Sequence, residues 1–182
     1  MAIPPAQAHL LCLLILVALA LPSHPHALPS SSPFDAALAT LQSQIAYNFR
    51  APDLLRRAMT HASYSRENGR ALAVLGLSAS QSAAALRALA ADHDASASAV
   101  SRRARDASGE AACAAAAARI GIPSIVRVAS GTKATAAPVV CGALRALFGA
   151  VAVDANSTHA AEEVFWKLHV LTTAELAKAA TM

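Results

Sequence analysis

The chain has little of the chemistry on which most enzymes depend. Only 14% of its 182 residues are charged and only 4% are aromatic. It contains no C-x-x-C, H-E-x-x-H or G-x-S-x-G sequence and no phosphate-binding glycine loop, so the common signatures of several enzyme classes are missing. Three cysteines are too few for a disulfide framework. The lack of a G-x-y period or a sustained charged heptad excludes collagen-like and coiled-coil chains.

Alanine is abundant and makes up about a quarter of the residues. Because alanine is the best helix former and has a small side chain, this composition favours helices packed closely on helices. The length argues for one domain. A net charge of +4 and a pI of about 9.3 permit an anionic partner without requiring one.

An uncharged apolar segment, residues 10–21, lies near the N-terminus. It is shorter than the roughly 20 residues that span a bilayer and has the length of a signal-peptide core, which argues against a permanent membrane anchor. We therefore predict a cleavable leader over residues 1–27 and entry into the secretory pathway. The destination would be the lumen of the endoplasmic reticulum or nuclear envelope, or secretion. Because no acidic residue precedes Asp35, a mitochondrial or plastid transit peptide is the alternative.

Two further features matter if the chain is secreted. Removing the leader removes Cys12 and leaves Cys113 and Cys141, which could form one disulfide or remain two separate buried thiols. Asn156 begins an N-x-S/T sequence, which is a candidate glycosylation site.

The rest of the chain predicts a set of short helices and an all-α fold. Apolar residues recur at helical spacing after Ser32, which predicts the first helix. Further helices are expected to begin near Pro52, Pro138 and Thr158. Three more are expected over residues 81–90, 96–107 and 110–120. The helix over residues 81–90 presents Leu86 and Leu89. Gly142 and Gly149 would let a neighbouring helix approach closely, and residues 172–175 form a capping box for a short tail. The expected organisation is a linker (28–33), a domain (34–171) and a tail (172–182).

Two segments carry a resemblance to a known family. Residues 54–64 (LLRRAMTHASY) resemble the A-[LM]-T-H-x-S-[YF] run of ribonuclease III domains, and residues 146–154 (ALFGAVAVD) are similar to the family's A-L-I-G-A-I-Y-L-D. The resemblance implies the all-α endonuclease fold and a homodimer. It also assigns structural roles to Thr60, His61, Ser63, Tyr64, Leu75, Gly76, Gly149 and Asp154.

The family's catalytic centre uses carboxylates on two helices to hold Mg²⁺, and none is found at the aligned positions. Residues 69–77 align with the family's N-E-R-L-E-F-L-G-D, and the segment before residue 146 aligns with its D-x-x-E. The residues at the five carboxylate positions are then Arg70, Ala73, Leu77, Gly142 and Arg145. Magnesium requires oxygen ligands, which these side chains do not supply. The sequence therefore predicts a pseudo-enzyme with no catalytic residue and no metal cofactor.

Several functions remain open at this point. The apolar leader, single degenerate domain and length are similar to a plant member of the family that acts in karyogamy, which favours an interaction scaffold with an unidentified protein partner. The alternative is a pseudo-nuclease that binds double-stranded RNA, and a working ribonuclease is the third hypothesis. Arg70 and Arg145 should lie within a few ångströms of each other, where they would either extend into solvent or form an anion site.

Overall fold

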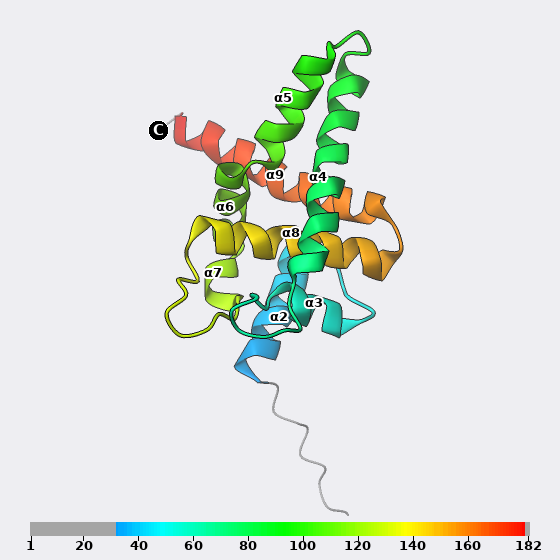
Figure 1. The fold of residues 1–182 in the computed structure, drawn as a ribbon. Coiled ribbons are helices and arrows are strands. Elements are labelled where there is room, and N and C mark those ends of the chain that lie inside the picture. The colour runs from blue at the N-terminus through cyan, green and yellow to red at the C-terminus, as the bar shows by residue number, and fades with distance from the viewer. Residues whose placement is uncertain (1–31, 181–182) are drawn as a thin grey trace, which may run out of the picture. The chain divides into compact units, whose positions relative to one another are not determined.

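The computed structural model describes the backbone of residues 32–180 and the side chains of residues 32–169. Every regular element in this part of the chain is a helix, as the sequence predicts (Figure 1). The leader and most of the linker predicted above lie outside the described residues.

Helix starts follow local chemical signals. The Ser32 hydroxyl accepts a hydrogen bond from the Asp35 backbone N–H, and the Ser96 hydroxyl accepts one from that of Ala99. Proline occupies the first turn of four of these helices, where its missing N–H costs nothing. The described helices are α2 (Pro33–Ile45), α3 (Pro52–Ala58), α4 (Arg70–Ala91), α5 (Ala97–Ser108), α6 (Glu110–Arg119), α7 (Ile122–Ile125), α8 (Ala137–Ala155) and α9 (Thr158–Ala180).

The core is organised around α8, which is buried along most of its length. It packs most extensively on α4 and also on α3, α6 and α9, while α5 lies beside α4 (Figure 1). Phe148 of α8 meets Phe165 of α9 edge-to-face, with ring centroids 5.6 Å apart. Because α8 is surrounded, its side chains set the spacing of the neighbouring helices.

Two glycines allow α4 and α8 to cross with their backbones in contact. A Cβ atom added at Gly76 would overlap the backbone of Arg145, and one added at Gly149 would overlap the backbone of Leu72. The predicted close approach at Gly149 is therefore confirmed. At Gly142 the prediction is wrong, since an added Cβ would meet no atom within 4 Å.

The helix expected over residues 81–90 is only the second half of α4, which has 22 residues. Leu86 and Leu89 are 60% and 41% exposed, so they do not form its buried face. Small residues face the core instead, because the close helix crossing leaves little room for leucine. The residues buried on α4 are Gly76, Ala79, Ser80, Ala83, Ala84 and Ala88.

No new helix begins at the expected capping box at residue 172, because α9 continues without a break to Ala180. No glycine or proline interrupts this segment, so the threonines at 172 and 173 are absorbed at a small cost in helix propensity. By length and composition alone, α4 and α8 could each span a membrane. In this fold they pack on each other, and α8 is the core helix.

Candidate functional site

A cavity of about 400 Å³ lies beside the crossing of α4 and α8. Three of the five positions at which the sequence resemblance predicts the family's metal-binding carboxylates line it. They are Arg70 and Ala73 on α4 and Gly142 on α8. We call it the α4–α8 cavity; its remaining lining residues are Ala58, Thr60, His61, Ala62, Gly69, Val126, Pro138, Val139, Ala143 and Ala146.

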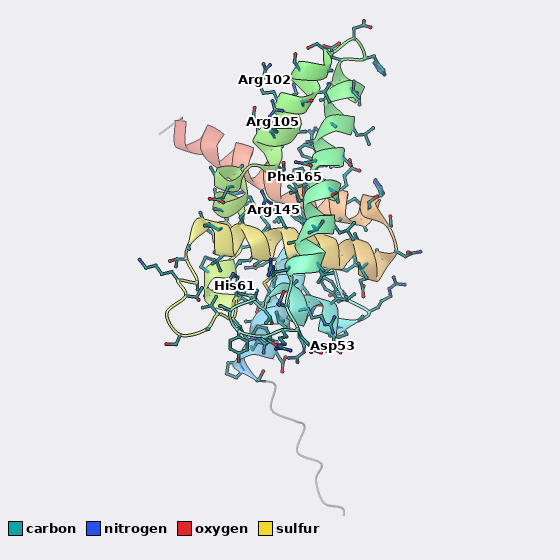
Figure 2. All side chains as sticks on the ribbon, viewed as in Figure 1. Asp53, His61, Arg102, Arg105, Arg145 and Phe165 are labelled. Atoms are coloured by element: carbon teal, nitrogen blue, oxygen red, sulfur yellow. A yellow bond between two sulfur atoms is a disulfide. The ribbon has the colours of Figure 1, made fainter. Side chains whose placement is uncertain are left out.

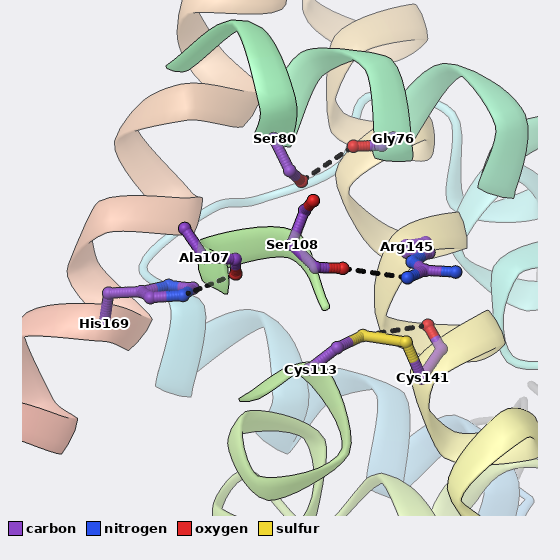
Figure 3. The surroundings of a disulfide bond; sticks show 8 residues. All are labelled: Gly76, Ser80, Ala107, Ser108, Cys113, Cys141, Arg145 and His169. Carbon is purple, nitrogen blue, oxygen red and sulfur yellow. Dashed lines mark hydrogen bonds between the residues drawn. A yellow bond between two sulfur atoms is a disulfide. The ribbon is translucent and has the colours of Figure 1, made fainter. Parts of the chain in front are cut away.

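The other two positions are not in this cavity. Leu77 is half-buried on α4 and does not line it. The Arg145 guanidinium donates a hydrogen bond of 2.8 Å to the carbonyl oxygen of Ser108, the last residue of α5 (Figure 3). A cation at a helix C-terminus also interacts favourably with the helix dipole. Arg145 lines a different cavity from Arg70, and it ties α8 to the end of α5.

The residues at these positions do not fit a divalent metal ion. Mg²⁺ is held by carboxylate, carbonyl and water oxygens. The five side chains supply two guanidinium groups, two apolar groups and one hydrogen atom. Across the described residues, no group of three or more His, Cys, Asp or Glu side chains could hold a metal.

The T-H-x-S-Y motif forms a strap that joins α3 to the segment after α7. Thr60 is 2% exposed, and its hydroxyl donates to the Arg56 carbonyl oxygen at 2.7 Å. The backbone N–H of His61 donates to the Arg127 carbonyl oxygen at 2.9 Å, and that of Arg127 donates to the Met59 carbonyl oxygen at 2.9 Å. These bonds hold the edge of the α4–α8 cavity in place.

The side chains of His61 and Ser63 form part of the same strap. The Ser63 backbone N–H donates to Nδ1 of His61 at 3.1 Å, so this nitrogen is an acceptor and the ring proton is on Nε2. The Ser63 hydroxyl lies 2.8 Å from Nδ1 and accepts a bond from the Ala129 backbone N–H at 3.1 Å. Both side chains are thereby fixed to the backbone around them.

Arg127 is a residue that the sequence analysis does not single out. Its guanidinium lies between two aromatic rings, 4.2 Å from the centroid of Phe34 and 5.0 Å from that of Tyr64. It also donates to the Thr60 hydroxyl at 2.7 Å. The exposed ring of Tyr64 therefore has a structural partner. A lone arginine in a short β-branched segment gives no local signal of these contacts.

Asp154 anchors the loop between α2 and α3, as its assigned structural role implies. Its carboxylate accepts hydrogen bonds from the Tyr47 hydroxyl at 2.8 Å and from the backbone N–H groups of Arg50 and Ala51 at 3.0 and 2.8 Å. Burial alone would raise the pKa of Asp154, but these donors and the Arg50 charge lower it below its ordinary value. Burial and this carboxylate raise the pKa of Tyr47 to about 12.

The remaining motif residues also have structural surroundings. Leu75 is half-buried and packs against the core, and Gly76 and Gly149 form the helix crossing. Cys113 of α6 and Cys141 of α8 are joined by a disulfide with Cα atoms 5.1 Å apart, next to the Arg145–Ser108 bond (Figure 3). Of the two alternatives that the sequence left open, one disulfide or two separate buried thiols, the structure has the disulfide.

The candidate glycosylation site and two arginines of α5 lie on the surface. Asn156 is exposed in the turn between α8 and α9, in a left-handed conformation (φ 51°) that asparagine adopts more readily than most residues. Arg102 and Arg105 are exposed on the side of α5 away from α4 (Figure 2).

The structure is similar to solved ribonuclease III nuclease domains. Two structures of this domain from Campylobacter jejuni match with TM-scores of 0.69 and 0.67. They cover 72% and 71% of this chain and 94% and 91% of the solved chains, each at 18% sequence identity. At that identity the likeness establishes the fold. No protein-family model matches the chain.

Sequence comparison extends this result. The chain is 45% identical over 142 residues to the Arabidopsis thaliana protein NUCLEAR FUSION DEFECTIVE 2, covering 78% of this chain and 74% of that one. It is 39% identical over 129 residues to Ribonuclease 3 of Phenylobacterium zucineum, covering 65% of this chain and 54% of the bacterial enzyme. The chain belongs to the ribonuclease III domain family, in the group of the Arabidopsis protein.

Proposed function

We propose that this chain is a non-catalytic member of the family that uses the nuclease fold as an interaction scaffold. The observation that carries the proposal is the set of side chains at the former metal positions. Arg70, Ala73 and Gly142 line the α4–α8 cavity without offering a single side-chain oxygen, and Arg145 binds Ser108 instead. Phosphodiester hydrolysis by this family depends on metal-bound water, for which such a site has no ligands.

The biological role that we propose is karyogamy, in particular the fusion of polar nuclei in the female gametophyte. The support is the name of the Arabidopsis relative and the 45% identity over most of both chains. The test is expression of this chain in Arabidopsis plants that lack the relative, with polar-nucleus fusion scored by microscopy. We expect fusion to be restored, and unfused nuclei in plants that accumulate the chain would contradict the proposal.

We further propose that the chain works in a secretory compartment. The support is the disulfide between Cys113 and Cys141 and the exposure of Asn156, since disulfides persist in oxidising compartments and glycosylation requires an accessible turn. In plant cells, deglycosylation should increase the electrophoretic mobility of the chain, and Asn156→Gln should abolish the shift. An unglycosylated chain recovered from mitochondria or plastids would contradict this location.

A homodimer is the proposed assembly. One of the Campylobacter jejuni structures is described as flexible in a region involved in dimer formation of its nuclease domain, and this chain shares that fold. Sedimentation of the purified chain should give twice the monomer mass of 18.5 kDa. A monomer at micromolar concentration would contradict the assignment.

Binding of double-stranded RNA is the second candidate function. The observation that favours it is a group of three exposed arginines on α5, Arg102, Arg103 and Arg105, which could contact phosphates. Replacing all three with Gln should weaken RNA binding and reduce its dependence on salt. If the unaltered chain binds no RNA at low salt, this candidate is eliminated and the scaffold proposal is unaffected.

A further inference from the structure

The α4–α8 cavity has the form of a small-molecule binding site. We propose that it binds a carboxylate with a compact apolar body, such as a medium-chain alkyl carboxylate. The proposal goes beyond the scaffold function and does not depend on it. It rests on three properties of the cavity: its apolar floor, the charge at its rim, and the open space at Gly142.

The floor of the cavity is apolar and removed from solvent. The lining side chains from α3, α8 and the segment after α7 are at most 8% exposed: Ala58, Val126, Val139, Ala143 and Ala146. Its volume of about 400 Å³ falls in the range of about 300–1,000 Å³ that is usual for small-ligand pockets. A short alkyl or aryl group would gain free energy by leaving water for such a surface.

The rim of the cavity is positively charged. Arg70 is exposed, and its guanidinium has no hydrogen-bond or ion-pair partner among the described residues. His61 uses Nδ1 within the strap, which leaves its Nε2–H available as a donor. None of the described residues that line the cavity is acidic. A carboxylate fits this rim because it accepts two bonds from one guanidinium, whereas a cation would be repelled.

Gly142 gives the cavity its room and provides a way to test it. A Cβ atom added there meets nothing within 4 Å, so a larger side chain can enter the cavity without displacing backbone. Gly142 lies within α8, where the helical backbone accepts other side chains, so the helix does not require glycine at this position. Gly142→Leu should therefore fill the cavity and leave the fold intact.

The experiment measures octanoate binding to the purified chain by calorimetry and by NMR shifts of residues that line the cavity. Octanol, which has the same chain length without the charge, should bind at least tenfold more weakly. Arg70→Gln should weaken octanoate binding about tenfold, and Gly142→Leu should abolish it. Arg66→Gln is the matched control, because Arg66 is also an exposed arginine but does not line the cavity.

The outcomes separate the proposal from nonspecific binding. Octanoate binding that is unchanged in Gly142→Leu would overturn it, as would the absence of binding at millimolar octanoate. Equal affinity for octanol and octanoate would overturn the role of Arg70. If Gly142→Leu does not melt cooperatively, Gly142→Val and Ala73→Leu replace it, since Ala73 lines the same cavity from α4. Unchanged binding in all folded variants would likewise overturn the proposal.

Discussion

Replacement of Asp154 by asparagine should be among the most damaging single substitutions of a polar residue in this fold. The carboxylate side chain is 1% exposed and accepts three hydrogen bonds, with the Arg50 Nε 3.8 Å away. Asparagine keeps one acceptor oxygen, which can retain the bonds from Tyr47 and Arg50. Its amide group would then face the Ala51 N–H, which places two donors against each other.

The size of the effect follows from these contacts. A hydrogen bond to a charged group contributes about 1.5–3 kcal/mol, and an unpaired buried donor adds about 1–3 kcal/mol. We expect Asp154→Asn to lower the free energy of unfolding by about 3 kcal/mol at pH 7, measured by urea denaturation. Asp53→Asn is the control, because that side chain is 93% exposed and its ion pair with Arg56 is 4.0 Å long. Its cost should be below about 1 kcal/mol.

The pH dependence gives a second check on the same residue. The pKa of Asp154 is lower in the folded chain than the unfolded value of about 3.9, so its ionised form stabilises the fold. That contribution is fully present above the unfolded pKa and is lost as pH falls through the folded pKa. The difference between the unaltered chain and Asp154→Asn should therefore shrink below about pH 4. A stability difference under about 1 kcal/mol at pH 7 would refute the reasoning.

Three further predictions concern other parts of the fold. Gly149→Ala should lower the free energy of unfolding, measured by heat or urea, by about 3 kcal/mol or more, because the added methyl group forces α4 and α8 apart. Gly142→Ala should leave the free energy of unfolding unchanged or raise it by up to about 1 kcal/mol. Reducing the Cys113–Cys141 disulfide, which closes a 28-residue separation, should lower the free energy of unfolding by about 3.5 kcal/mol, and no change would contradict the bridge. The Tyr47 ring should titrate near pH 12 by NMR, and stability should fall as pH rises from about 10 through 12; a midpoint near 10 would contradict its bond to Asp154.

The parts of the fold that the sequence predicts are those with local signals. Ser32 and Pro33 mark the start of α2, and Pro52 and Pro138 lie in the first turns of α3 and α8, because capping and proline act within one turn. The start of α4 has neither a proline in its first turn nor a capping side chain at Gly69, and its local signal is weaker: the Asn68 side-chain oxygen accepts a hydrogen bond from the Arg70 backbone N–H at 3.0 Å. The buried face of α4 is mostly alanine, which leaves no hydrophobic periodicity.

The parts that could not be predicted depend on contacts between distant segments. Arg145 binds a carbonyl oxygen 37 residues away, and Arg127 lies over the ring of Phe34. The family resemblance predicts that Arg145 occupies a former metal position, but it gives no sign that the side chain turns toward α5. Gly142 and Gly149 look alike in sequence, and only the packing of α4 distinguishes the open position from the closed one.

The measurement that tests the central claim most directly is cleavage of double-stranded RNA by the purified chain in Mg²⁺ or Mn²⁺, with a bacterial ribonuclease III as the positive control. Because the side chains at the five positions where the resemblance predicts metal ligands contain no oxygen, we expect no metal-dependent shortening of the duplex over hours. Cleavage that requires the metal, recurs in independent preparations and disappears in folded Gly142→Leu would contradict the account, since it would place a working site in the α4–α8 cavity.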